Sequence, residues 1–110
     1  MKVDKRDGRA YLRLGYVYLL KKRPAEAIAV LERSIAESDL EDEWRARAIA
    51  HFDLARAHGQ VGAIDTAFKE LELAVENGFA DRSRVVGESD LFALAKDSRW
   101  AGLLEKLERR

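Results

Sequence analysis

Few side chains in this sequence could bind a metal or act as a nucleophile. It has no cysteine, which excludes thiolate metal sites, thiol nucleophiles and disulfides. The two histidines, His51 and His58, lie seven positions apart with Asp53 between them. A two-histidine metal site prefers a spacing of about four residues and needs a third ligand. We therefore predict no metal ligands and expect both histidines to pack in the core, with pH sensing and metal binding as the alternatives.

No arrangement of residues typical of an active site is present. The serines stand at expected helix caps or helix faces without a histidine at a useful spacing, and no glycine-rich phosphate loop occurs. The 20 acidic residues are accompanied by 20 basic ones and are explained as solvated surface. We predict no enzyme activity, no catalytic residues and no cofactor.

Length and composition indicate a single helical domain over residues 1–110. The chain is 47% hydrophobic with one proline, and alanine and leucine dominate its apolar residues, which favours helix. No segment has the roughly 18 consecutive apolar residues that a membrane span needs, and no signal peptide is recognisable. We expect a cytoplasmic protein that does not bind membranes.

The charges cancel overall but are unevenly distributed. Residues 2–23 hold eight basic and two acidic side chains, whereas residues 26–43 hold seven acidic and one basic. Two solvated faces that attract each other explain this pattern. A basic first helix with Tyr11 and Tyr16 between its cations leaves nucleic-acid binding as a minor alternative, which a net charge of zero does not favour.

The elements that would position a binding site recur after 40 positions. Residues with the spacing of one buried helix face return 40 positions later. They are Tyr11, Leu14, Gly15, Tyr18, Ala27, Leu31 and Ser34, followed by His51, Leu54, Ala55, His58, Ala67, Leu71 and Ala74. Such a period is typical of helical repeat proteins.

Four helices are expected in the two units, at about residues 7–22, 24–38, 43–60 and 63–76. Asp7 is a plausible cap for the first helix, and Asp39 or Asp42 for the third, which begins within residues 39–43. A connection of two residues forces the first two helices into an antiparallel hairpin.

Two glycines have expected roles in this arrangement. Gly15 lacks a side chain on the buried face, so the second helix should approach the first closely there. The Asn77-Gly78 pair should end the fourth helix, because both residues tolerate a left-handed conformation.

The last third of the chain should form shorter helices. Asp81 can cap a short helix through Val86, residues 87–90 break it, and residues 91–95 form another turn or two. Asp97 then caps a final helix. Its four large apolar residues share one stripe that should pack across the fourth helix and close the core: Trp100, Leu103, Leu104 and Leu107.

The repeated residues resemble the tetratricopeptide repeat, whose first helix carries a large residue, Leu, Gly and Tyr and whose second carries Ala, an aromatic and Ala. The resemblance covers residues 8–38 and 43–78, and the tail, 79–110, is similar to the segment that follows the last repeat in many bacterial proteins. It implies an all-α fold of antiparallel helix hairpins, stacked as a short superhelix with a capping helix. A period of 40 exceeds the usual 34 residues, so we place the extra residues in the acidic junction around residues 39–45.

The resemblance also implies a binding site, because in this family the first helices of successive units line a concave groove. Here that face would carry Arg9, Leu12, Arg13, Tyr16, Leu19 and Leu20 from the first helix and Ile49, Phe52, Asp53 and Arg56 from the third. Uncovered, it would be more apolar than a monomer normally shows. The alternative is that the final helix or a second copy covers it.

The resemblance implies a protein–protein interaction module, a scaffold or adaptor that binds an unidentified peptide or partner helix. Some family members bind the carboxylate tails of chaperones through lysines and asparagines, but the first and third helices contain no asparagine. Apolar anchoring flanked by Arg9, Arg13 and Arg56 favours a partner with hydrophobic and some acidic residues. Self-association as a homodimer through the first helix is the alternative function.

Overall fold

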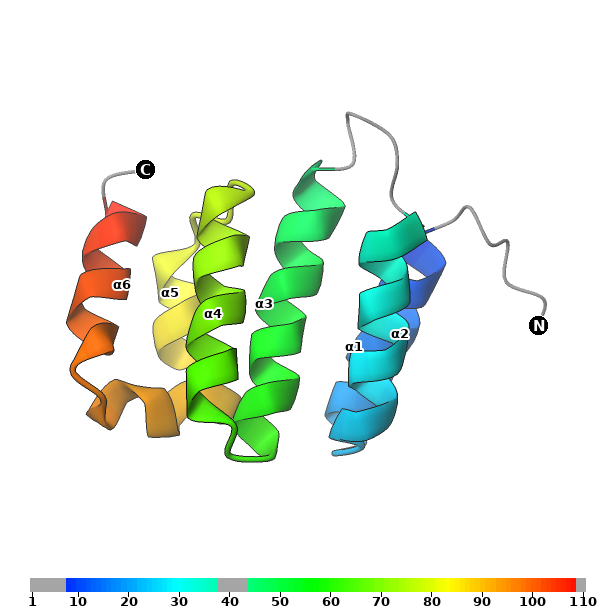
Figure 1. Cartoon of the computed structure of the whole chain (residues 1–110), viewed down its shortest axis with the longest axis horizontal. Coiled ribbons are helices and arrows are strands. Elements are labelled where there is room, and N and C mark those ends of the chain that lie inside the picture. Colours follow the sequence, from blue (N-terminus) through cyan, green and yellow to red (C-terminus); the bar gives the residue numbers. More distant parts are fainter. Residues whose placement is uncertain (1–7, 38–43, 109–110) are drawn as a thin grey trace.

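All regular elements in residues 8–37 and 44–108, which the computed structural model describes, are helices. Figure 1 shows two antiparallel hairpins side by side, α1 with α2 and α3 with α4, followed by shorter C-terminal helices next to the second hairpin. The prediction of an all-α fold of packed helical hairpins is thereby confirmed.

The first hairpin joins α1 (Gly8–Leu20) to α2 (Pro24–Glu37). The α1 helix ends because Lys22 adopts a left-handed conformation, with φ of 56°, and the Arg23 amide donates a hydrogen bond to the Tyr18 carbonyl at 2.9 Å. This is the Schellman termination, in which glycine normally takes the left-handed position. A residue with a side chain costs about 1–2 kcal/mol there.

The two helices of this hairpin come close together at Gly15. A β-carbon on Gly15 would lie only 2.5 Å from Cδ2 of Leu31, which is fully buried. Nonbonded carbon atoms pack at about 3.5–4.0 Å, so only glycine fits this position without a shift of the Leu31 side chain or of α2. The close approach predicted from the sequence is confirmed.

The second hairpin repeats this construction with α3 (Trp44–Gln60) and α4 (Ile64–Glu76). Gly62 takes the left-handed position, with φ of 76°, and the Ala63 amide donates to the His58 carbonyl at 2.9 Å. Here the termination uses glycine, so the backbone carries no steric penalty.

The α4 helix ends where the Asn77-Gly78 pair predicted. Gly78 is left-handed, with φ of 105°, and the Phe79 amide donates to the Ala74 carbonyl at 2.9 Å. Asn77 stays at negative φ and instead donates from its side-chain amide to the Leu73 carbonyl at 2.8 Å. This stop turns the chain back toward α3.

Three short elements follow: α5 (Arg82–Gly87), the 3-10 helix η2 (Ser89–Lys96) and α6 (Arg99–Glu108). The Asp81 carboxylate caps α5 by accepting from the Arg84 amide at 3.1 Å, as predicted. The expected turns around residues 91–95 are the longer helix η2.

The predicted cap of the final helix also forms. The Asp97 carboxylate accepts from the backbone amide of Arg99 at 2.9 Å and from its guanidinium. These hydrogen bonds and the positive charge of Arg99 lower the pKa of Asp97 to about 2. The α6 helix packs against α4, as its apolar stripe predicted.

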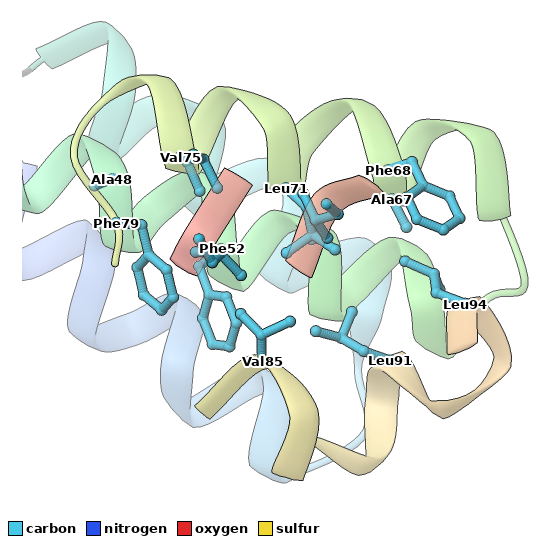
Figure 2. Packing of buried hydrophobic residues seen from close by; sticks show 14 residues of the cluster. Ala48, Phe52, Ala67, Phe68, Leu71, Val75, Phe79, Val85, Leu91 and Leu94 are labelled. Carbon is cyan, nitrogen blue, oxygen red and sulfur yellow. The ribbon is translucent and has the colours of Figure 1, made fainter. Parts of the chain in front are cut away.

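Two clusters of buried residues hold these layers together. One lies between the hairpins, and its buried members are Leu19, Ala27, Leu31, Leu54 and Ala57. The larger one joins α3 and α4 to the C-terminal helices (Figure 2). The caps predicted for α1 and α3, Asp7 and Asp39 or Asp42, lie outside the described residues.

Candidate functional site

The predicted groove residues on α1 are mostly exposed. Arg9, Arg13, Tyr16 and Leu20 lie at the surface, and Leu12 beside them is half-buried. The spacing of the four exposed residues, i, i+4, i+7 and i+11, puts them in one row along the helix. We call Arg9, Arg13, Tyr16 and Leu20 the α1 stripe.

Leu19 belongs to the interior rather than to this surface. It is fully buried in the cluster between the hairpins, together with Leu31 and Leu54. The expectation that Leu19 is exposed was wrong, because α3 packs against the side of α1 that carries it. Leu19 therefore packs beneath α1 and is not part of the exposed row.

The predicted groove residues on α3 are covered. Phe52, Asp53 and Arg56 are buried, and Ile49 is half-buried. The expectation that Phe52 would be uncovered was wrong, because residues 79–96 fold back over this face. We call residues 79–96 the docked segment; it contains α5 and η2 and precedes the final helix.

Aromatic contacts fix the beginning of the docked segment on α3. The rings of Phe52 and Phe79 stack with centroids 4.5 Å apart and an angle of 11° between their planes. The guanidinium of Arg84 lies 5.1 Å from the Phe52 ring centroid. Figure 2 shows Val85 and Leu91 following Phe79 along the same buried surface. Stacked rings and cation–π contacts of this kind add to the energy of apolar burial.

Ionic contacts fix the end of the docked segment. The buried Arg56 guanidinium places Nε 3.2 Å from Oε2 of Glu88 and 3.2 Å from Oδ2 of Asp90. Asp90 also accepts hydrogen bonds from Gln60 at 3.3 Å and from Lys22 at 3.1 Å. The docked segment is therefore tied both to α3 and to the turn of the first hairpin.

Asp90 is ionised in this environment. Burial by itself would raise the pKa of Asp90, but the hydrogen bonds from Gln60 and Lys22 and the charges of Lys22 and Arg56 outweigh it. The pKa of Asp90 is consequently lower than its ordinary value. A carboxylate that receives several donors in this way remains charged at neutral pH.

Asp53 is in the opposite situation. Its side chain is almost completely buried, and among the described residues Oδ1 accepts no hydrogen bond, although Nη1 of Arg56 lies 3.7 Å away. Burial raises the pKa of Asp53 to about 6, against the charges of Arg56 and Arg84, which lower it. The cluster therefore contains a carboxyl group that titrates just below neutral pH.

The α1 stripe borders the ion cluster that Arg56 forms with Asp53, Glu88 and Asp90. The Arg56 guanidinium lies 5.9 Å from the centroid of the Tyr16 ring. Tyr16 is 43% exposed and Leu20 is 60% exposed.

Two of the four stripe residues, Arg9 and Arg13, are basic and none is acidic, so the stripe favours carboxylates. Lys22 and Arg23 beyond its end are paired with Asp90 and Glu26.

The two histidines lie apart from the α1 stripe and the docked segment in their role, and neither belongs to a candidate site. Both are half-buried, and Nδ1 of His51 lies 2.6 Å from Oε2 of Glu70 on α4. Their expected place in the core is thus reached only in part, because His51 pairs with a carboxylate at the edge of the hairpin. In the described parts of the chain, no group of three His, Asp or Glu residues could hold a metal ion.

A comparison with protein families finds a match in the first hairpin. Residues 8–38 match the family model of the tetratricopeptide repeat, and this span contains α1, α2 and the turn between them. The protein is tetratricopeptide-repeat-like. This resemblance supports a role in binding other proteins, because such repeats are interaction modules. No curated protein and no solved structure matches the chain.

The sequence left open whether this tetratricopeptide-like protein covers its own predicted groove, and it suggested the final helix rather than the docked segment as the cover. One signal was present: Glu88 and Asp90 stand between apolar residues that turned out to be buried, Val85, Leu91 and Leu94. An acidic pair in such a place needs a buried cation, and Arg56 stands in a helix whose other buried residues are mostly alanine.

No helix in the described ranges is long and apolar enough to cross a membrane.

Proposed function

We propose that this protein is a scaffold or adaptor module that binds a peptide or helix of another protein along the α1 stripe. The exposure of Tyr16 and Leu20 on a tetratricopeptide-like hairpin carries the proposal. Large apolar and aromatic side chains that lie close together on an exposed helix face often mark a contact site for another protein. Such side chains are common anchors of protein interfaces.

The burial of Phe52, Asp53 and Arg56 supports a binding site on the α1 half of the predicted surface alone. Leu12 lies at the border of the stripe, Leu19 packs in the core beneath α1, and Arg56 contacts the Tyr16 ring. The basic residues of the stripe favour a partner that combines carboxylates with apolar side chains. As predicted from the sequence, we propose that the protein acts in the cytoplasm as a binding module and catalyses no reaction.

The test is the capture of binding proteins by the full chain and by two matched variants. Leu20→Ser changes the stripe, whereas Val61→Ser changes an equally exposed aliphatic residue in the turn between α3 and α4, which is 56% exposed. We expect mass spectrometry to find proteins that the parent and Val61→Ser retain and that Leu20→Ser loses. Equal retention by all three forms would overturn the proposal.

Light scattering on the same three proteins separates a partner from self-association. A mass of 12.5 kDa for the parent leaves the stripe open to a different protein. A doubled mass that only Leu20→Ser returns to the monomer value would replace the proposal with a homodimer.

A further inference from the structure

The 40-residue period gives the α1 stripe a counterpart in the second hairpin, and the structure shows what covers that counterpart. The stripe residues Arg9, Arg13, Tyr16 and Leu20 correspond to Ile49, Asp53, Arg56 and Gln60, and Leu12 beside the stripe corresponds to Phe52. The second set lies beneath the docked segment, whereas the α1 stripe is exposed. The molecule therefore contains the same helix face once covered and once open.

The docked segment runs parallel to α3. Near the beginning of α3, Ile49 and Asp81 line one cleft of about 220 Å³. One turn later the Phe52 ring lies under Arg84, and near the end of the helix Gln60 donates to Asp90. Successive residues of α3 thus meet successive residues of the docked segment.

We propose that the α1 stripe binds a segment of a partner protein that runs parallel to α1, with carboxylates in its first half and large apolar side chains in its second half. This inference rests on the proposed function and specifies its partner. The contacts between α3 and the docked segment serve as the template. For each α3 residue in these contacts we take the equivalent residue of α1 and ask which partner side chain would suit it.

The first half of the partner follows from a reversal of charge. On α3, Asp53 is close to the cation of Arg84, which lies over the neighbouring Phe52 ring. On α1 the residue in the place of Asp53 is Arg13, which is exposed. A residue that occupies the place of Arg84 on α1 should therefore be acidic, since opposite charges across an interface favour association and like charges oppose it.

The apolar second half of the partner segment is inferred from the end of the stripe, where α1 has less polar residues than α3. On α3, Arg56 and Gln60 are polar and both bind the Asp90 carboxylate. On α1 their places hold Tyr16 and Leu20, which offer apolar surface. A carboxylate buried there would lose its hydrogen-bond donors, whereas a leucine or aromatic side chain would be shielded from water.

A second copy of this chain does not fit the stripe through its own docked segment. That segment carries Arg84 where the stripe needs a carboxylate, and Asp90 where it needs an apolar side chain. Its apolar side chains, including Leu91 and Leu94, are already buried in its own core. The order of charged residues along the docked segment therefore favours a different protein as the partner.

The experiment selects peptides from a random phage-displayed library on the full chain and compares variants. The best peptide is synthesised with two relatives, one with lysine in place of its carboxylates and one with its sequence reversed. Binding is measured by fluorescence anisotropy on the parent, on Tyr16→Ala and Leu20→Ser, and on Arg13→Asp. The control is Lys69→Asp, which changes the net charge as much as Arg13→Asp does, at an exposed position of α4.

We expect enriched peptides in which acidic residues precede leucine or aromatic residues. Arg13→Asp should weaken the acidic peptide by about tenfold or more and strengthen the lysine peptide, because it reverses one charge pair. The Lys69→Asp variant should bind like the parent, and the reversed peptide should bind poorly to all forms.

Each contrary result has its own meaning. Peptides that need Tyr16 and Leu20 but show no acidic preference, or bind equally well when reversed, would overturn this inference and leave the proposed function standing. If no peptide is enriched, or if Tyr16→Ala and Leu20→Ser do not affect the enriched ones, both proposals fail.

Discussion

The two hairpins present the same helix face in opposite conditions. On α3 this face is closed by the docked segment, with Phe52 stacked on Phe79 and Arg56 paired with Glu88 and Asp90. On α1 the corresponding row stays at the surface and has positive charge. The same helix face can therefore be buried in the core or left at the surface, depending on whether the chain supplies its own covering segment.

The largest expected difference is in stability. Phe52→Ala should lower the free energy of unfolding by about 3–5 kcal/mol, because it leaves a cavity beneath the docked segment. Tyr16→Ala, on the exposed face, should change it by less than about 1 kcal/mol. Urea denaturation followed by circular dichroism measures both. Equal losses for the two variants would show that the faces are not closed and open as described.

Asp53 provides a test in which removal of a buried charge should raise the free energy of unfolding. Its pKa is about 6 in the folded protein against an ordinary value of 3.8, so the folded state binds its proton more tightly than the unfolded state. The group therefore lowers stability above about pH 6, and this loss disappears as the pH falls toward 4. Asp53→Asn should stabilise the protein at pH 7.5 by up to about 3 kcal/mol.

The pH series itself is the control for Asp53→Asn. The difference between variant and parent should shrink steadily between pH 7 and pH 4, whatever other groups do in both proteins. A variant that is destabilised at pH 7.5 would mean that the Asp53 carboxylate contributes to the ion cluster more than its burial costs.

Asp90 should behave in the opposite way. Asp90→Asn removes the charge that Arg56, Gln60 and Lys22 share and should cost about 1–3 kcal/mol. Because the pKa of Asp90 is lowered, its contribution is present above about pH 4 and is lost as the pH falls through that lowered pKa. Denaturation at pH 7 and pH 3 checks this, and an equal cost at both would assign the effect to shape rather than charge.

The smallest expected difference lies in the two turns. Lys22 and Gly62 are equivalent by the period of 40, and both are left-handed. Lys22→Gly should stabilise by up to about 1 kcal/mol, since relief of strain exceeds the loss of an exposed ion pair. Gly62→Lys should cost about 1–2 kcal/mol. Thermal unfolding measures both, and changes of the same sign would contradict the equivalence of the turns.

The sequence predicted the parts of the fold that depend on local patterns. The four long helices, the close contact at Gly15 and the stop at Gly78 follow from helical spacing and backbone conformation, and they are where expected. The Asp81 and Asp97 caps follow from short-range hydrogen bonds in the same way.

The site was only half predictable, for a physical reason. Whether Phe52 is core or surface depends on residues 79–96, whose helices are short and whose contacts with α3 lie far away in sequence. Helical spacing identifies a face but cannot say what covers it. Leu19 illustrates the same point, because it is buried by α3 rather than by its own hairpin.

The most direct test of the account is an NMR titration of isotope-labelled protein with the acidic–apolar peptide selected on the parent chain. We predict that the amide signals of Arg13, Tyr16 and Leu20 shift, while those of Asp53 and of the docked segment keep their positions. Shifts concentrated on Asp53, Arg56 and residues 79–96 would contradict the account, because they would mean that the peptide displaces the docked segment and that the closed face is the true binding site.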